Sequence, residues 1–495
     1  MPGAISTLTS PDYAVVLVAL AVLLIIGVAF SRRQHDTVDF FLARRRVPWW
    51  AAGLSFVATE ISAVTILSVP ATAYSENWEY AQLFVGSSLA KLAVAFLFIP
   101  AFYRHDVTTI YEFLAHRFGQ RSQVTASIFF FVTRLIGSGA RLTITAVAVG
   151  YLMGWSLIPT IAVFSVVAIL YIGAGGVQAV VWTNVFQALM FLAAGAIALA
   201  FLIAHVDGGL LAVISTAGAA GRLDVVDWGP SITAPSFWSS ALTNPNIVWV
   251  ALLNGFVGSM AAFGTDHDLM QRLLTVETRG GSQRTLALTP LGTLLTLLTY
   301  LAVGAALFTY YSQQPAPILG RPDEILPHFI ATAMPEVLRG VMLAAIVLAS
   351  IDSPLGSLSA SFVTDIYRPL LVPGRSETHY LRVSRLAVLA FGVVLAVLAW
   401  GLAFVQDKAL WTVFKVAGVA SGSLLGVFLL GLLTRRPVND TANVVAMVAM
   451  TLVNLLLLVF AETGVFHFAW SWLVIVGTLG TMLLAVLGSQ LVTRQ

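Results

Sequence analysis

Hydrophobic residues are grouped in long runs along this chain, and short polar stretches separate the runs. Most runs reach about 18 residues, the length that an α-helix needs to cross the hydrocarbon core of a bilayer. Counted by hydropathy, they predict about 13 transmembrane helices and therefore an all-α polytopic membrane protein. The predicted spans are 12–30, 48–75, 82–103, 124–152, 155–174, 177–205, 246–264, 284–311, 337–367, 382–406, 411–433, 440–461 and 469–491.

Basic residues are distributed unevenly between the loops that join these runs. Alternate loops are rich in arginine, and the loops between them carry few basic residues. Because basic residues stay on the cytoplasmic side, this bias predicts an external N-terminus and a cytoplasmic C-terminus. Arg32 and Arg33 follow the first run, which is the reverse of the charge order in a signal peptide. The first run is therefore expected to be a retained helix.

The composition excludes several other classes of protein. Of the 495 residues, 58% are hydrophobic and 10% are charged, and the mean hydropathy of +0.90 excludes a soluble globular protein. The absence of cysteine excludes disulfides and thiolate metal sites. The runs contain neither a Walker loop nor a nucleophile–base pair, so an ATP-driven pump and an enzyme are not expected. The basic residues are sorted by membrane side, so they do not indicate a nucleic-acid partner.

The ninth run differs from the others because polar residues lie in its centre. Hydroxyl residues recur along it at steps of three, four and seven, which places them on one helix face. They are Ser350, Ser353, Ser357 and Thr364. Asp352 lies among them near mid-span, where a carboxylate costs on the order of 3 kcal/mol unless it has a partner. This oxygen-rich face predicts either a site for a hard cation or a polar seam between helices.

Two other runs predict interrupted helices. The second contains Glu60 at mid-span and Pro70, which removes a backbone hydrogen-bond donor. The seventh, 246–264, is short and rich in glycine. Interrupted helices at corresponding positions of two halves indicate inverted repeats with a binding site at the midplane. For the seventh run, glycines at a helix contact are the alternative explanation.

Four stretches of the chain are distinctive enough to suggest a family. They are TTIYEFLAHRFG (108–119), GGVQAVVWTNVFQ (175–187), GTDHDLMQR (264–272) and SIDSPLGSLSASFVTDIYRP (350–369). In this order, and on this topology, they resemble motifs of the sodium/solute symporter family. The resemblance implies a LeuT-type fold, with a ten-helix core of two inverted five-helix repeats, one helix before it and two after. It also implies alternating access with Na⁺ as the co-transported ion.

The resemblance further implies how the chain is divided. A single transmembrane transporter domain covers 1–495. Within it, 12–30 is the extra N-terminal helix, 48–205 is the first repeat, 246–433 is the second repeat, and 440–491 forms the two C-terminal helices.

By family position, the resemblance places a sodium ion between the second and ninth spans. Its ligands would be the backbone carbonyls of Ala58, Ile61 and Ile346, with side-chain oxygens at positions 349 and 350. Ser350 offers a hydroxyl, whereas Ala349 stands where the family often has one. One ligand is therefore missing, and this weakens the expectation of sodium dependence.

Two further departures from the family pattern suggest a second ion site. Asn184 stands where the family usually has aspartate, and Asp352 stands where relatives often have serine. If these positions face each other, the carboxylate has moved across the site and the local charge is kept. We therefore expect a second cation or proton site at Asp352, Ser353 and Asn184, with a structural Asp–Asn hydrogen bond as the alternative.

Polar and aromatic residues within the spans are candidates for solute binding. Glu60 could receive a solute hydroxyl or amine, pair with a buried arginine, or carry a proton. Arg141 lies nearer the midplane than Arg134, and a buried guanidinium suits a carboxylate. Lys91 is expected to pair within the bundle or to extend towards the interface. The candidates are Thr59, Glu60, Ser62, Thr65, Gln82, Arg141, Asn254 and Phe263.

Taken together, these features predict a secondary transporter that imports a small polar, anionic solute with sodium. Its partners would be that solute, the sodium ion and the lipid bilayer, and the compact loops favour a bacterial inner membrane. Proton coupling through Glu60 and Asp352 is one alternative. A sensor or channel with a transporter-like fold is the other.

Overall fold

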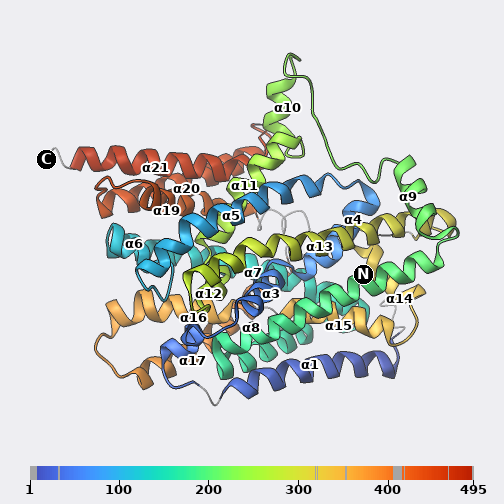
Figure 1. Ribbon diagram of the computed structural model, residues 1–495, viewed down its shortest axis with the longest axis horizontal. Coiled ribbons are helices and arrows are strands. Elements are labelled where there is room, and N and C mark those ends of the chain that lie inside the picture. Colours follow the sequence, from blue (N-terminus) through green and yellow to red (C-terminus); the bar gives the residue numbers. More distant parts are fainter. Residues whose placement is uncertain are drawn as a thin grey trace.

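Long apolar helices make up most of the chain (Figure 1). The computed structural model describes residues 8–31, 34–317, 319, 322–351, 354–404, 415–416, 418–466 and 468–492. Within these residues, nine helices are long and apolar enough to cross a bilayer, and a bent pair adds a tenth. This confirms the prediction of an all-helical, multi-pass membrane protein.

The helices fall into a long and a short group. The long helices are α1 (Ser10–Ser31), α5 (Tyr80–Arg104), α7 (Gln120–Met153), α8 (Leu157–His205), α11 (Val248–Thr265), α13 (Arg279–Gln313), α17 (Glu377–Leu402), α20 (Asp440–Glu462) and α21 (Trp472–Val492). The short ones are α2 (Thr37–Leu42), α3 (Trp49–Glu60), α4 (Ala63–Ser75), α6 (Glu112–Arg117), α9 (Gly209–Ala219), α10 (Phe237–Thr243), α12 (His267–Leu274), α14 (Ile325–Ala333), α15 (Leu338–Ile351), α16 (Leu355–Ser361) and α19 (Ser421–Leu433). Two 3₁₀ turns, η1 (Ala43–Arg45) and η2 (Pro322–Glu324), and a π-helical segment, η3 (Phe362–Leu371), complete the set.

The longest helix, α8, contains two of the predicted spans. Its 49 residues would extend about 74 Å as one straight helix, roughly twice the thickness of a bilayer. The helix is interrupted at Gly176, which has a φ of 60° and a ψ of −157°. A Cβ at this position would lie 2.6 Å from the carbonyl oxygen of Phe40, so the chain needs glycine here. The spans 155–174 and 177–205 therefore meet at a backbone break without an intervening loop.

The second predicted span is broken, as its sequence suggests. The helix α3 ends at Glu60, α4 begins at Ala63, and the backbone between them is extended. Ser62 and Thr65 form a capping box that starts α4. Pro70 lies inside α4, so the break occurs well before the proline.

The seventh predicted span is not interrupted where it was expected to be. The helix α11 is continuous to Thr265, and the break before α12 falls at Asp266, beyond the glycine-rich part. The glycines instead allow a close contact between α5 and α11. A Cβ on Gly255 would lie 2.2 Å from the carbonyl oxygen of Leu83, and one on Gly86 would lie 2.2 Å from that of Leu252. The alternative explanation is therefore correct for this run.

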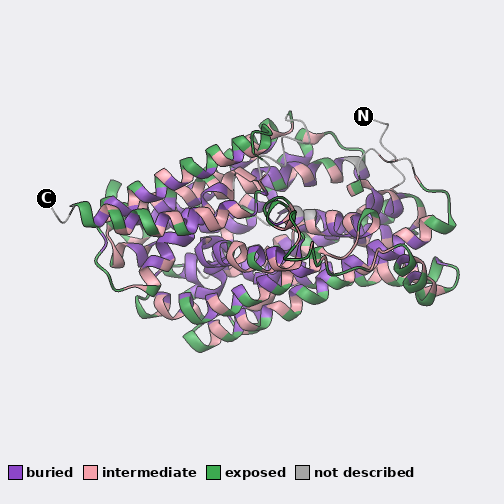
Figure 2. Cartoon of the chain, turned by 90° about the horizontal axis from the view of Figure 1, so that it is seen from above, coloured by how far each residue is buried: buried purple, intermediate pink, exposed green. Residues whose placement is uncertain are grey.

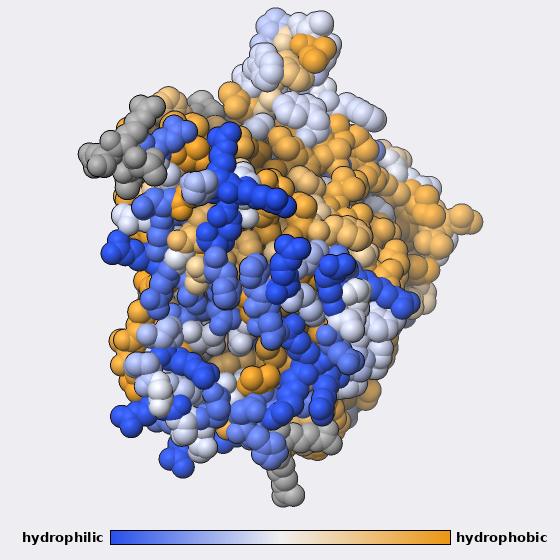
Figure 3. All heavy atoms as spheres, turned by 60° about the vertical axis from the view of Figure 1, so that its left-hand side comes forward, coloured by the Kyte–Doolittle hydropathy of each residue, from blue (hydrophilic) through white to orange (hydrophobic). Residues whose placement is uncertain are grey.

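Burial separates the interior of the bundle from its outer faces. Buried residues line the centre of the assembly, and exposed ones lie on the outward faces of the helices and at their ends (Figure 2). The end of the molecule where α6 and the C-terminus lie is rich in hydrophilic residues, whereas its flanks are apolar (Figure 3). This distribution fits a protein whose flanks face lipid and whose ends face water.

Candidate functional site

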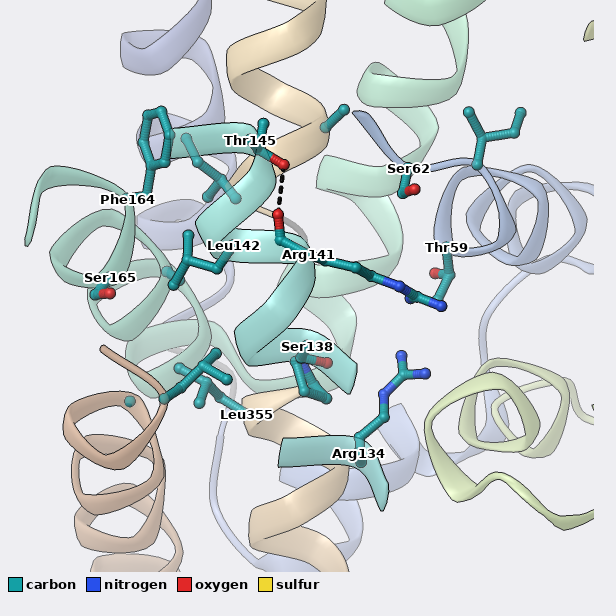
Figure 4. A pocket seen from close by; sticks show the side chains of 17 residues that line it. Thr59, Ser62, Arg134, Ser138, Arg141, Leu142, Thr145, Phe164, Ser165 and Leu355 are labelled. Atoms are coloured by element: carbon teal, nitrogen blue, oxygen red, sulfur yellow. Dashed lines mark hydrogen bonds between the residues drawn. The ribbon is translucent and has the colours of Figure 1, made fainter. Parts of the chain in front are cut away.

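Two adjoining cavities lie beside the break between α3 and α4. The smaller one, about 40 Å³, has room for an ion or a few water molecules (Figure 4). The larger one, about 280 Å³, has room for a small organic solute. The two share Thr59, Arg134, Ser138 and Arg141 in their walls. The helix α7, which carries the last three of these residues, therefore borders both an ion-sized space and a solute-sized one.

Arg141 extends from the middle of α7 into this region. Its guanidinium reaches towards Thr59, while Ser62 lies nearby on the other side of the helix break (Figure 4). The residue is exposed although it lies mid-helix, so the cavity that it lines is open to water. A guanidinium in a partly enclosed, wet cavity can bind a carboxylate through two parallel hydrogen bonds.

Glu60 forms an ion pair with Lys91 of α5. The Lys91 ammonium lies 2.7 Å from the Glu60 carboxylate and 3.0 Å from the hydroxyl of Thr293. Glu60 nevertheless lines the larger cavity, together with Phe263. It also lines a third cavity with Thr65, Thr293 and Phe263. Its counter-ion is thus the lysine of α5, and not the arginine that the sequence suggested.

Two of the predicted sodium-ligand positions line the smaller cavity. They are Ile61 of the helix break and Ala349 of α15, so the second and ninth spans meet there. Ala58 and Ile346 are buried and are not among the described residues that line this cavity. The side chain of Ser350 is not described, so its hydroxyl cannot be placed against the others.

Two amide side chains of α8 bridge the helices on either side of this cavity. Asn184 donates to the hydroxyl of Thr59, at 2.9 Å, and Gln187 donates to the carbonyl of Leu348, at 3.0 Å. Both side chains are completely buried. Their amide oxygens have no hydrogen-bond partner among the described residues, and such oxygens are suitable cation ligands. Gln187 was not among the sequence candidates, although it lies one turn after Asn184.

The second ion site proposed from the sequence is only partly covered by the structure. Asp352 and Ser353 lie outside the described residues. Asn184, the third member of that site, contacts Ser55 and Thr59 of α3.

Gln82 and Asn254 lie among helix contacts. Gln82 is buried at the start of α5 and donates to the carbonyl of Asn246 at 2.9 Å, which ties α5 to the segment before α11. Asn254 is buried within α11, and its side-chain oxygen lies near Gly258. Phe263, in contrast, packs against Phe56 with ring centroids 5.5 Å apart and forms part of the cavity wall.

A buried network of charges lies at one end of the larger cavity. Arg134 pairs with Asp266, at 3.2 Å, and with Asp268. Asp268 also pairs with Arg272 and accepts a hydrogen bond of 2.8 Å from Ser357. Arg272 and Asp268 are each 1% exposed, so their charges are buried within the protein. Burial opposes ionisation of Asp268, but Arg134 and Arg272 together hold its pKa below the usual range.

His267 lies inside this network as a neutral side chain. Both ring nitrogens are buried without a hydrogen-bond partner in the described part of the chain. The ring packs against Tyr111 and Phe130. Burial lowers the pKa of His267 to about 3. No group of three or more His, Cys, Asp or Glu side chains suited to a transition metal occurs in the described residues.

Comparisons with known proteins agree with one another. Residues 40–452 match the model of the sodium:solute symporter family. The sodium/sialic acid symporter SiaT of Proteus mirabilis is 32% identical over 465 residues, which cover 92% of this chain and 90% of that protein. The sodium/sialic acid symporter NanT of Aliivibrio fischeri is 30% identical, over 96% and 92% of the two chains. The substrate-bound, outward-open structure of a Na⁺-coupled sialic acid symporter superposes with a TM-score of 0.84 at 27% identity, covering 98% of both chains.

Proposed function

The chain belongs to the sodium:solute symporter family, and we propose that it imports a small anionic solute together with sodium. The co-transported ion of this family is sodium, and the fold is that of a transporter that works by alternating access. The observation that carries the anionic solute is Arg141, a water-exposed guanidinium in the wall of a cavity of about 280 Å³. Two relatives that are sodium/sialic acid symporters support the same solute class, because sialic acid carries a carboxylate.

We propose that the sodium ion is held in the smaller cavity. Its ligands would be the carbonyl oxygens of Ala58, Ile61 and Ile346 and the hydroxyl of Ser350. Support comes from Ile61 and Ala349, which line one space of about 40 Å³ between the second and ninth spans. Oxygen ligands in a space of this size suit a hard monovalent cation better than an organic solute.

A second cation site would use Asn184 with Asp352 and Ser353. The buried amide oxygen of Asn184 supports this proposal, because it has no hydrogen-bond partner among the described residues and burial normally requires one. Proton coupling through Glu60 is less favoured. Glu60 is already engaged in an ion pair with Lys91.

We propose 13 membrane spans, of which 48–205 and 246–433 form the two inverted repeats. The 13 spans follow if the two parts of α8 are counted separately and α15, α16 and η3 together form the ninth span. The break at residues 61–62 and the break at Asp266 would occupy corresponding positions in the two repeats. The N-terminus would be outside and the C-terminus cytoplasmic, in a bacterial inner membrane. The network of Arg134 with Asp266 and Asp268 would then close the cytoplasmic end of the solute cavity.

Uptake into proteoliposomes tests the function directly. Reconstituted protein should accumulate a radiolabelled carboxylate, such as sialic acid or a monocarboxylate, when a sodium gradient is imposed and not when choline replaces sodium. Arg141→Lys should retain the charge but lose the paired hydrogen bonds, so it should transport with reduced affinity. Accumulation that follows a pH gradient and ignores sodium would contradict the proposal. Conductance without coupled accumulation would indicate a channel.

A further inference from the structure

Lys91 is a fully buried cation in the middle of α5. Its side chain is 1% exposed, and its ammonium lies 2.7 Å from the carboxylate of Glu60 and 3.0 Å from the hydroxyl of Thr293. The ring of Phe263 lies 5.0 Å from the ammonium and that of Phe56 lies 6.0 Å from it. Four helices, α3, α5, α11 and α13, contribute to these contacts.

These groups have the composition of a cation-binding pocket. A carboxylate and a hydroxyl offer oxygen atoms, and two aromatic rings offer their negatively polarised faces. Glu60 is also the last residue of α3, where the helix dipole is negative and disfavours a carboxylate but favours a cation. The end of α3 therefore needs one positive charge, and the α5 side chain supplies it.

The pocket lies next to the solute cavity and near one of the predicted sodium ligands. Glu60 lines both the cavity that contains Arg141 and the third cavity with Thr65 and Thr293. Its side chain is 13% exposed, so the carboxylate can be reached by small ions from the cavity. Ile61 lines both the third cavity and the smaller cavity, whereas Ala349 of α15 lines the smaller cavity.

We propose that the ammonium of Lys91 is a tethered cation in a pocket that would otherwise bind a free monovalent cation. The tether makes this charge permanent, so neutralising Glu60 consumes no mobile ion during a transport cycle. The Lys91 ammonium also holds one carboxylate oxygen of Glu60 towards α5. When the Lys91 side chain is truncated, a free monovalent cation from solution should bind next to Glu60 in its place. The inference concerns this pocket alone and does not depend on which solute is transported.

Two truncations of Lys91 leave spaces that match two different amines. Lys91→Ala removes three carbon atoms and the nitrogen, which corresponds to n-propylammonium. Lys91→Leu leaves a shorter gap next to Glu60, which corresponds to methylammonium. A ligand that binds only the folded state raises the melting temperature by mass action. Melting is measured on the purified full chain in detergent, without solute, in n-propylammonium, methylammonium or choline chloride at equal ionic strength.

We expect n-propylammonium to raise the melting temperature of Lys91→Ala by about 2 °C or more relative to choline. Methylammonium should do the same for Lys91→Leu, and neither amine should affect the unmodified chain. The responses should disappear in the double variants that also carry Glu60→Gln. Equal melting of both single variants in all three salts overturns the proposal, as does a response that persists with Glu60→Gln.

If a single variant is too unstable for melting measurements, its recovery as folded protein is measured instead. In that case the variant should be recovered as a monodisperse species only when the matching amine is present during solubilisation. Recovery of the Glu60→Gln double variant, together with failure of the single variant in every salt, would show that a free cation cannot replace the tether. That result also overturns the proposal. Failure of sodium-coupled uptake would not change these measurements, so the two proposals fail separately.

Discussion

Two arginines of α7 lie on the same helix face but have different surroundings. Arg134 pairs with the carboxylates of Asp266, at the break between α11 and α12, and of Asp268, in the first turn of α12. Arg141, two turns further along, is exposed to the cavity beside Thr59 and Ser62. The first guanidinium pairs with two carboxylates, whereas the second borders a cavity that is open to water. Arginines seven residues apart on one helix face can therefore differ in their surroundings, and we propose that only the second meets the solute.

Loss of the Arg134 guanidinium should have the greatest effect on the stability of the protein. Arg134→Gln removes a counter-charge from two buried carboxylates, and losing one partner of a buried ion pair costs about 3–5 kcal/mol. Because Arg272 still faces Asp268, we expect a loss of about 3 kcal/mol in the free energy of unfolding. Denaturation in detergent measures it. The double variant Arg134→Gln/Asp266→Asn should recover part of the loss. A single variant as stable as the parent would show that the ion pairs of Arg134 do not stabilise the fold.

Arg141→Gln should weaken solute binding. A charge-assisted, paired hydrogen bond to a carboxylate contributes enough that its loss lowers affinity about 10- to 100-fold. Binding of carboxylates by the purified variant is measured by calorimetry in sodium chloride. Glutamine keeps one N–H donor group but is shorter than arginine and uncharged, so the change removes the charge and the reach together. Unchanged affinity for every anionic solute that binds the parent would show that Arg141 does not recognise the carboxylate.

The neutral imidazole beside the Arg134 network predicts a pH dependence. The folded protein protonates His267 only near pH 3, whereas an unfolded histidine titrates near pH 6.5. The unfolded state therefore binds more protons between these values, and stability is present above pH 6.5 and lost as the pH falls towards 3. His267→Phe keeps a ring against Tyr111 and Phe130 but cannot be protonated.

The stability of His267→Phe relative to the parent should thus increase as the medium is acidified. At pH 5 the expected gain is about 2 kcal/mol, from roughly 1.4 kcal/mol for each pH unit below 6.5. Melting curves of the two proteins from pH 8 to pH 5 measure the difference. A difference that stays constant over this range would mean that His267 takes up a proton in the folded state.

The smallest expected effect concerns the ion-sized cavity beside Arg141. Ala349→Ser adds the hydroxyl that the family pattern leads one to expect next to Ile61. One added oxygen ligand should contribute about 1 kcal/mol, which corresponds to roughly a fivefold increase in sodium affinity. Sodium titration of the melting temperature measures it, with Ala349→Val as a control that adds bulk without an oxygen atom. Equal sodium affinity in the serine and valine variants would place the ion elsewhere.

The pattern of apolar runs and motifs was enough to predict an all-helical, multi-pass membrane protein and its family. Long apolar runs are typical of membrane spans, because each span must satisfy its backbone hydrogen bonds within itself and cover them with apolar side chains. The interruption after Glu60 and the candidates around it, Thr59, Ser62 and Thr65, could be predicted from the same local pattern. So could the position of Arg141 in a cavity wall, because a guanidinium within an apolar run needs a partner or water.

The pairing of charges could be found only from the packed arrangement of the helices. Lys91 is 31 residues from Glu60, and Asp268 is 134 residues from Arg134, so no local pattern links them. The glycines of the seventh predicted span could also not be interpreted from the sequence, because glycine permits both a helix break and a close helix contact. In the structure, Gly86 and Gly255 form a close contact between α5 and α11. Partner choice depends on which helix faces meet after packing, whereas hydropathy depends only on neighbours along the chain.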